Sequence, residues 1–250
     1  MNVAVTEAPE ACPPAQPISR RFSDSEAFCP PLENGDRLTR KEFERRYEAM
    51  PHVKKAELIE GIVYMGSPVR IKSHSKPHGM ILTWLGAYSA ATPGTDFGDN
   101  GSLRLDPDNE PQPDAYLRIE AEAGGRSQID AEDYLAGAPE LIVEVAASSA
   151  SIDTRDKRHV YRRNGVQEYV VWRVLEKAVD WWELVEGEYQ PLRPAAEGIL
   201  ESKAFPGLRL AVAPLLALDV KAVLDELQAG LQSEAHQLFA AQLAARMKPA

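Results

Sequence analysis

The sequence has few cysteines, no long apolar runs and no excess of positive charge. Its two cysteines, Cys12 and Cys29, lie in a proline-rich leader and are too few for a disulfide framework or a zinc site. The longest apolar stretches, such as residues 141–147 and 208–218, are too short or too interrupted to span a bilayer. Residues 1–17 lack the basic start and apolar core of an export signal. We therefore expect a cytoplasmic protein with no membrane partner.

The formal net charge of −10 argues against indiscriminate binding of nucleic acids, because counterion release needs clustered lysine and arginine. The charge is uneven, however. Residues 155–163 carry five fixed positive charges against one negative charge. A second basic stretch contains Arg70, Lys72, His74, Lys76 and His78. A solvated surface is the more ordinary interpretation of either stretch. The net charge is therefore only weak evidence against a DNA partner.

We expect a domain at residues 36–218, a disordered arm at residues 1–35 and an amphipathic C-terminal helix at residues 219–250. The arm is rich in Pro, Ala, Ser and Glu and has no apolar periodicity. The C-terminal segment carries an apolar stripe that fits either core packing or a dimer interface, so a homodimer is left open. The stripe consists of Val220, Val223, Leu224, Leu227, Leu231, Leu238 and Leu243.

Apolar periodicity and turn residues indicate an α/β domain. Residues 141–146 form an apolar run interrupted by one carboxylate, which is typical of a strand buried on both faces. Residues 120–138 look irregular and acidic. The expected helices cover about residues 39–50, 77–90 and 153–164, and the expected strands lie within residues 56–65, 101–105, 114–119, 141–146, 168–174 and 179–185.

Two carboxylates in this pattern point to a metal. Asp114 begins one expected strand, and Glu144 lies inside another. Burial of an ionised carboxylate is costly unless a partner compensates for the lost hydration. Two such groups on neighbouring strands would repel each other unless a cation lay between them, and oxygen ligands without His or Cys favour Mg²⁺ or Mn²⁺ over zinc. The alternative is that Asp114 caps a turn and Glu144 pairs with an arginine.

The helix expected after Glu144 strengthens the metal interpretation. Asp153, Lys157 and Tyr161 are spaced at i, i+4 and i+8, so they share one face. A short turn after Glu144 would bring the positive N-terminal end of this helix back to the strand. Lys157 could then orient a water or stabilise developing charge at a phosphate. Its alternative role is that of a solvated lysine paired with Asp153.

Seven short segments carry a resemblance to a known family. Their order resembles the Uma-two family of restriction endonucleases, within the PD-(D/E)XK nuclease superfamily, over roughly residues 38–218. No single segment is specific, but their combined order is. They are Glu57-Leu58-Ile59-Glu60-Gly61, Pro77-His78, Gln112-Pro113-Asp114, Leu141-Ile142-Val143-Glu144-Val145, Asp153 to Tyr161 with Asp156-Lys157-Arg158 between them, Asn164-Gly165-Val166-Gln167-Glu168-Tyr169 and Phe205-Pro206-Gly207-Leu208.

The resemblance implies a restriction-endonuclease-like fold, in which helices flank a mixed central sheet, and cleavage of phosphodiesters with Mg²⁺. It implies that Asp114 and Glu144 are the catalytic metal ligands and that the Val145 carbonyl could add another oxygen. It also places Glu57 and His78 at the border of the site. Glu57 would then bind the metal or support its ligands, and His78 would cap a helix or contact a phosphate.

One position departs from the superfamily pattern. The lysine expected two residues after Glu144 is replaced by Ala146. The resemblance implies that the lysine comes from the following helix, where Lys157 stands. Asp153 and Tyr161 then support the site or contact the substrate.

Two main hypotheses follow. The first is an Mg²⁺-dependent endonuclease that acts on DNA and needs no nucleotide cofactor. The second is a nuclease-fold module that binds nucleic acid or protein with weak or no catalysis. A third is an assembly subunit that works through residues 219–247.

Overall fold

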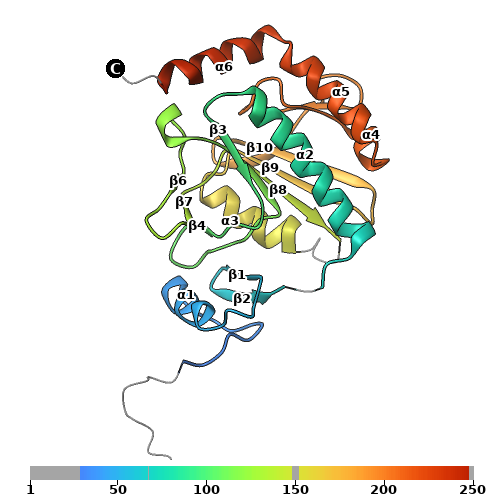
Figure 1. Ribbon diagram of the computed structural model, residues 1–250. Helices are drawn as coiled ribbons and strands as arrows, with labels where there is room; N and C mark the ends of the chain where they lie inside the picture. The colour runs from blue at the N-terminus through green and yellow to red at the C-terminus, as the bar shows by residue number, and fades with distance from the viewer. Residues whose placement is uncertain (1–28, 67, 148–151, 248–250) are drawn as a thin grey trace, which may run out of the picture. The chain divides into compact units, whose positions relative to one another are not determined.

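The computed structural model describes residues 29–66, 68–147 and 152–247, and a six-stranded mixed sheet forms its centre (Figure 1). The chain from Pro31 to Ala250 forms one compact unit. The prediction of a mixed sheet flanked by helices is confirmed. The strands follow the order β11-β10-β9-β8-β5-β3, with β3 (Thr95–Gly98), β5 (Ala115–Ile119), β8 (Leu141–Ala146), β9 (Glu168–Arg173), β10 (Ala178–Val185) and β11 (Glu188–Pro191).

Strand β8 lies inside the sheet and is buried along its whole length, as its apolar run predicts. Successive side chains of a strand point to opposite faces. Leu141, Val143 and Val145 pack in the core beneath α2 (Lys76–Ala91). Ile142 and Ala146 pack in a second core on the opposite face. The register therefore directs the intervening Glu144 toward that second face.

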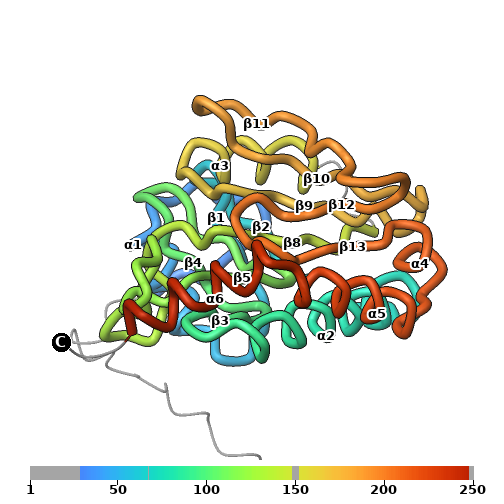
Figure 2. The backbone as a smooth tube through the Cα atoms, turned by 90° about the horizontal axis from the view of Figure 1, so that it is seen from above, coloured from blue at the N-terminus to red at the C-terminus, as the bar shows by residue number. Residues whose placement is uncertain are grey.

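The second face is covered by the connection between β8 and β9, which are parallel. This connection contains a π-helical segment, η3 (Ile152–Lys157), followed directly by α3 (Arg158–Arg163). The helix predicted for residues 153–164 is thus present, but its first part is wound as a π-helix. Figure 2 shows α3 on one side of the sheet and α2, α5 and α6 on the other.

A smaller layer contains α1 (Arg40–Glu48) and the hairpin of β1 (Ala56–Ile59) and β2 (Ile62–Met65). Glu60 and Gly61 both have positive φ, of 52° and 71°, which a two-residue hairpin turn of type I′ requires. The layer has its own apolar core, to which Leu32 contributes, so the described fold begins before residue 36. The prediction of disorder for residues 1–28 falls outside the described residues. This separate core consists of Leu32, Phe43, Ala56, Leu58 and Val63.

The acidic segment 120–138 is less irregular than expected. It contains the short 3-10 helix η2 (Ala121–Ala123) and two short strands, β6 (Gln128–Ile129) and β7 (Leu135–Ala136). Strand β7 pairs in parallel with β4 (Leu103–Arg104), which is the ordered part of the strand expected at residues 101–105.

The C-terminal region corrects one expectation. The single helix expected at residues 219–250 is two helices, α5 (Val220–Leu231) and α6 (Glu234–Arg246), separated at Gln232 and Ser233. The stripe does not share one side, since Val223, Leu227 and Leu231 lie in the main core while Val220 and Leu238 are 42% and 60% exposed. The hairpin of β12 (Ile199–Glu201) and β13 (Arg209–Ala211), followed by α4 (Val212–Leu216), precedes α5. No helix among the described residues is long and apolar enough to cross a membrane.

Candidate active site

Asp114 and Glu144 face each other across the antiparallel pair β5–β8, in which Ala115 is the register partner of Val143. Both residues are buried, with 5% and 2% of their surfaces exposed. Each carboxylate accepts a hydrogen bond from a backbone N–H group. The Asp114 N–H donates to Glu144 Oε2 at 3.3 Å, and the Val145 N–H donates to Asp114 Oδ2 at 2.8 Å. The backbone of the sheet therefore holds the two carboxylates in place.

Lys157 lies among three carboxylates on the α3 face. Its Nζ is 2.8 Å from Glu57 Oε1, 3.0 Å from Glu144 Oε1 and 3.6 Å from Asp153 Oδ1. The hydroxyl of Tyr161 also donates to Glu144 Oε1, at 3.0 Å. The structure thus places Lys157 and Tyr161 with Glu57, Glu144 and Asp153, next to Asp114. Asp153, Lys157 and Tyr161 share one face, as their spacing predicts.

Two further residues at the site were missed by reasoning from the sequence. Lys55, just before β1, places Nζ 3.2 Å from Asp114 Oδ1 and 3.0 Å from Asn100 Oδ1. His74 places Nε2 3.5 Å from the same Asp114 oxygen, and its Nδ1 lies 3.1 Å from the Val145 carbonyl oxygen. The signal for Lys55 was its i, i+2 spacing from Glu57, which puts both on one face of an extended segment. His74 stood out only as part of a basic stretch.

The structure places His78 and Glu57 around the backbone of Asp114. His78 Nε2 lies 2.6 Å from the Asp114 carbonyl oxygen. Glu57 Oε1 accepts a hydrogen bond of 2.8 Å from the Gln112 N–H, two residues before Asp114. Both side chains therefore hold the segment that carries the aspartate. A phosphate contact by His78 stays a prediction.

The charges of the site do not balance. Four carboxylates, on Asp114, Glu144, Glu57 and Asp153, face the ammonium groups of Lys55 and Lys157, so two negative charges remain when these six groups are ionised and His74 is neutral. Burial and these charges together shift the pKa values of Asp114 and Glu144 in opposite directions.

Burial raises the pKa of Glu144 well above its usual value, although the Lys157 ammonium opposes this rise. Neighbouring carboxylates raise it further, with Asp153 first and then Asp114. Burial would also raise the pKa of Asp114, but the charges of Lys55 and His74 outweigh it, and that pKa is lowered. Lys157 stays charged, because the carboxylates hold its pKa well above the usual value against the effect of burial.

The donor set suits a hard divalent cation held by few protein ligands. No group of three or more His, Cys, Asp or Glu side chains in the described parts of the chain is arranged to hold a metal ion. Mg²⁺ commonly takes one or two carboxylates and completes its octahedron with waters and substrate phosphates. Asp114 and Glu144 are two such carboxylates, and a divalent charge would offset the excess of two negative charges that remains when His74 is neutral. The Val145 carbonyl, which the resemblance offers as a further ligand, already faces His74.

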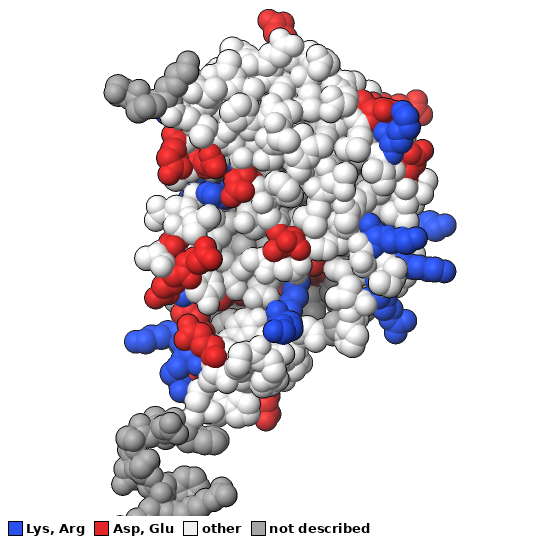
Figure 3. Space-filling view, viewed as in Figure 1, with Lys and Arg blue, Asp and Glu red and all other residues white. Residues whose placement is uncertain are grey.

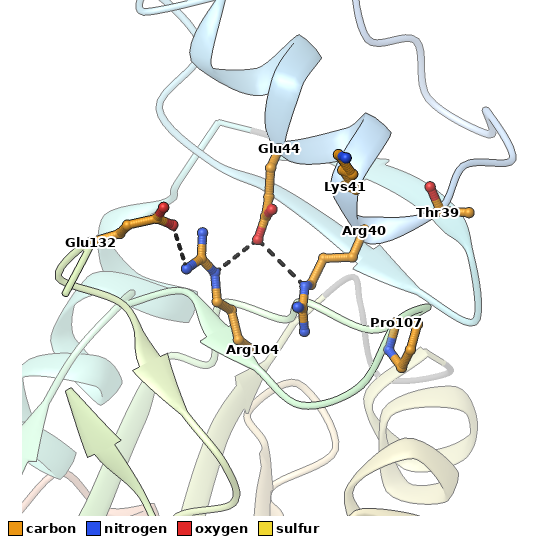
Figure 4. Close-up of a pocket in the computed structure, with 7 residues that line it drawn as sticks. All are labelled: Thr39, Arg40, Lys41, Glu44, Arg104, Pro107 and Glu132. Carbon is orange, nitrogen blue, oxygen red and sulfur yellow. Dashed lines mark hydrogen bonds and ion pairs between the residues drawn. The ribbon is translucent and has the colours of Figure 1, made fainter. Parts of the chain in front are cut away.

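A second polar cluster lies apart from these residues, in a pocket of about 390 Å³ below α1 (Figure 4). Its two arginines are paired with acidic residues. Glu44 Oε1 lies 2.8 Å from Arg104 Nε and 3.4 Å from Arg40 Nε, and Arg104 Nη1 lies 2.6 Å from Glu132 Oε2. The pocket is lined by Thr39, Arg40, Lys41, Glu44, Arg104, Pro107 and Glu132.

Next to this pocket, Glu110 is 1% exposed and its carboxyl group hydrogen-bonds to that of Glu44. Burial and then this bond raise the pKa of Glu110 to about 8, from a value of 4.5 in the absence of such surroundings. Between these two pH values the folded chain binds a proton that the unfolded chain has lost. The stabilisation is therefore complete below pH 4.5 and is lost as the pH rises through about 8.

We expect Glu110→Gln to flatten this pH dependence, because an amide donates to Glu44 at every pH. Between pH 5 and 9, the free energy of unfolding should fall by at least about 1 kcal/mol less in the variant than in the wild type, a difference equivalent to roughly one pKa unit. Urea denaturation at several pH values measures it. The exposed Glu122→Gln is the matched control and should follow the wild type. Parallel curves for wild type and Glu110→Gln would contradict the assignment.

Comparisons with known proteins identify the family of the chain and a structure with a similar fold. Residues 40–213 match the family model Uma2, whose description is "Putative restriction endonuclease". A crystal structure from Anabaena variabilis, described as a "putative nuclease belonging to DUF820", has a similar fold, with a TM-score of 0.53 at 15% sequence identity. The similarity covers 70% of this chain and 97% of that one. No curated protein matches the sequence.

Proposed function

Because the chain belongs to the Uma2 family, we propose that it is a metal-dependent endonuclease that hydrolyses phosphodiester bonds in DNA. Asp114 and Glu144 would hold Mg²⁺ or Mn²⁺. When bound there, the metal would supply a Lewis acid for the phosphate and lower the pKa of a coordinated water. The other polar groups of the site hold these two carboxylates in position and shift their pKa values.

One observation carries the proposal. Two interlocked carboxylates lie on neighbouring strands, with an excess of two negative charges around them. A structural ion-pair network would be expected to balance its buried charges, because an uncompensated buried charge is costly. Burial, and then the neighbouring carboxylates, raise the pKa of Glu144 despite the opposing charge of Lys157. A divalent cation would supply the missing positive charge.

The two lysines would have different tasks. Lys157 is 4% exposed and touches three carboxylates, so it positions Glu144 and Glu57 and has no open side toward a substrate. The Lys55 side chain is 31% exposed and contacts the outer oxygen of Asp114. It would be the ammonium group available to a phosphate oxygen, where it can stabilise developing charge. Tyr161 donates to Glu144 and thereby fixes the orientation of that carboxyl.

A binding module without turnover is the second candidate. It is favoured by the occupation of Glu144 Oε1, which accepts hydrogen bonds from both Lys157 and Tyr161. The lysine that the superfamily places next to the acid is also absent, since Ala146 stands there.

Metal binding and cleavage separate the two candidates. We expect wild-type protein to bind Mn²⁺ in a calorimeter at micromolar to millimolar metal, and to nick and linearise supercoiled plasmid in Mg²⁺ or Mn²⁺ but not in EDTA. Single-stranded DNA and RNA of matched sequence define the substrate class. Retention of DNA on a gel without Mn²⁺ binding or cleavage would favour the binding module. The absence of both metal binding and nucleic-acid binding would contradict both candidates.

A further inference from the structure

A long part of the chain near the site contains no acidic residue. The protein has 38 Asp and Glu residues, yet none occurs between Glu60 and Asp96. Within this interval, Val69–Lys76 carries three fixed positive charges and one histidine. We call this segment the basic arm. It contains the π-helical segment η1 (Ile71–Ser75) and leads directly into α2.

The side chains of the basic arm are turned to solvent. Arg70, Lys72 and Lys76 are exposed, and within the described parts of the chain none of them forms an ion pair. Val69 and Ile71, which alternate with them, are 65% and 64% exposed. Figure 3 shows Lys and Arg side chains gathered at the edge of the molecule where Figure 1 places the beginning of α2. Unpaired positive charges of this kind can neutralise the phosphates of a nucleic acid and so release the counterions condensed on it.

One residue of the basic arm, His74, contacts the proposed active site. His74, inside η1, contacts both the Asp114 carboxylate and the Val145 carbonyl. His78, one turn further on, contacts the Asp114 carbonyl. Short π-helical segments are uncommon and frequently occur at functional sites. Here the winding directs one histidine inward while its charged neighbours stay outside.

Some of the charges in other basic stretches of the chain are paired with acidic residues. In the run at residues 155–163, Arg162 lies 2.7 Å from Glu188, and Arg163 lies 2.9 Å from Glu60. In the pocket of Figure 4, Arg104 is paired with Glu44 and Glu132, and Arg40 with Glu44. The basic arm differs from these stretches because none of its three fixed charges forms an ion pair with a described residue, whereas several charges of the other stretches do.

We propose that the basic arm binds the phosphate backbone of the nucleic acid, next to the scissile phosphodiester. The inference rests on the proposed function, since it is the adjoining phosphodiester site that selects a nucleic acid over an acidic protein or an anionic membrane. The arm would contact phosphates through Arg70, Lys72 and Lys76, and because phosphate contacts carry no sequence information, it contributes affinity without sequence preference. His74 fixes the arm to Asp114 and so sets the register of the bound strand against the site.

Binding in EDTA tests the proposal without any cleavage. The probe is a fluorescent 20-base-pair duplex, and anisotropy is measured between 50 and 300 mM KCl. In the triple variant Arg70→Gln/Lys72→Gln/Lys76→Gln, the Kd should rise at least about tenfold at 100 mM salt. The slope of log K against log salt should fall by roughly 2 to 3, because each lost phosphate contact removes about 0.9 from the slope for B-DNA. Circular dichroism verifies that the variant is folded.

The matched control removes the same charge elsewhere. Lys41, Lys203 and Lys221 are exposed on other elements, and their replacement by Gln should change Kd and slope much less. Equal losses in both triple variants would overturn the proposal, because net charge alone would explain them. Wild type that binds phosphatidylserine vesicles but no duplex would also overturn it. Duplex binding that is lost only in the arm variant supports the proposal even if wild type cleaves nothing, a result that rejects the nuclease alone.

Discussion

Asp114→Asn is expected to abolish cleavage while the protein stays folded. The amide keeps an oxygen that can accept from the Val145 N–H, now 2.8 Å from Asp114 Oδ2, but it loses the charge that would hold a metal. We expect the rate of Mg²⁺-dependent plasmid cleavage to fall at least about 10³-fold, equivalent to roughly 4 kcal/mol of lost transition-state stabilisation. The affinity for Mn²⁺ should fall with it. Plasmid nicking and calorimetry on the same preparations measure both quantities.

A substitution of the same kind outside the site provides the control. Asp225 lies on α5 and pairs with the exposed Lys221, so Asp225→Asn should cleave at the wild-type rate. Glu144→Gln should behave like Asp114→Asn, because Glu144 would be the second carboxylate ligand of the metal. If Asp114→Asn and Glu144→Gln both cleaved as fast as wild type, the metal site would have to lie elsewhere.

Lys157→Met is expected to destabilise the whole protein. It leaves Glu57, Glu144 and Asp153 buried together without the ammonium that now lies among them. Removal of one partner from a buried ionic cluster costs about 3–5 kcal/mol, because the remaining charges lose their compensation. Urea denaturation in EDTA at neutral pH measures this loss. The exposed Lys203→Met serves as the control and should be within about 0.5 kcal/mol of wild type.

Two additions make the Lys157 experiment specific. Mn²⁺ should restore part of the stability of Lys157→Met, because a ligand at 100 times its Kd stabilises a folded state by about 2.7 kcal/mol. The double variant Lys157→Met/Glu144→Gln should be more stable than Lys157→Met, since it removes one of the uncompensated charges. A Lys157→Met protein as stable as wild type, in metal and in EDTA alike, would show that the four groups are not coupled.

The central features of the site could be predicted because they follow from simple periodicities. A carboxylate inside an apolar run marks Glu144, and the strand period of two fixes the face to which it points. The spacing of Asp153, Lys157 and Tyr161 puts them on one helical face even though η3 is π-helical. These signals are local, so the sequence contains them in full.

The missed residues depend on contacts between distant segments. Lys55 lies outside any strand, and only the fold brings it to Asp114, 59 positions further along the chain. His74 lies in a π-helix, where the 3.6-residue period does not apply. The short outer strands β3 and β11 were also missed, because their exposed side chains show no apolar alternation.

The C-terminal helix was predicted as one element because the break has no strong sequence signal. Ser233 begins α6 by accepting a hydrogen bond from the His236 N–H at 3.2 Å. The buried His236 ring then contacts the Leu231 carbonyl and Thr92 Oγ1, each at 2.9 Å. The turn is thus maintained by a partner 144 positions away, which no local pattern reports.

The separate small core around Phe43 has a consequence for how the site can be lost. Lys55 and Glu57 belong to the layer that this core holds together, whereas Asp114 and Glu144 belong to the large sheet. Proteins open in cooperative parts whose free energies lie below that of global unfolding. Opening of the small layer alone would strip the site of one ammonium and one carboxylate while the sheet stayed intact. Any opening of the small layer would therefore end the lifetime of the complete site before the sheet unfolds.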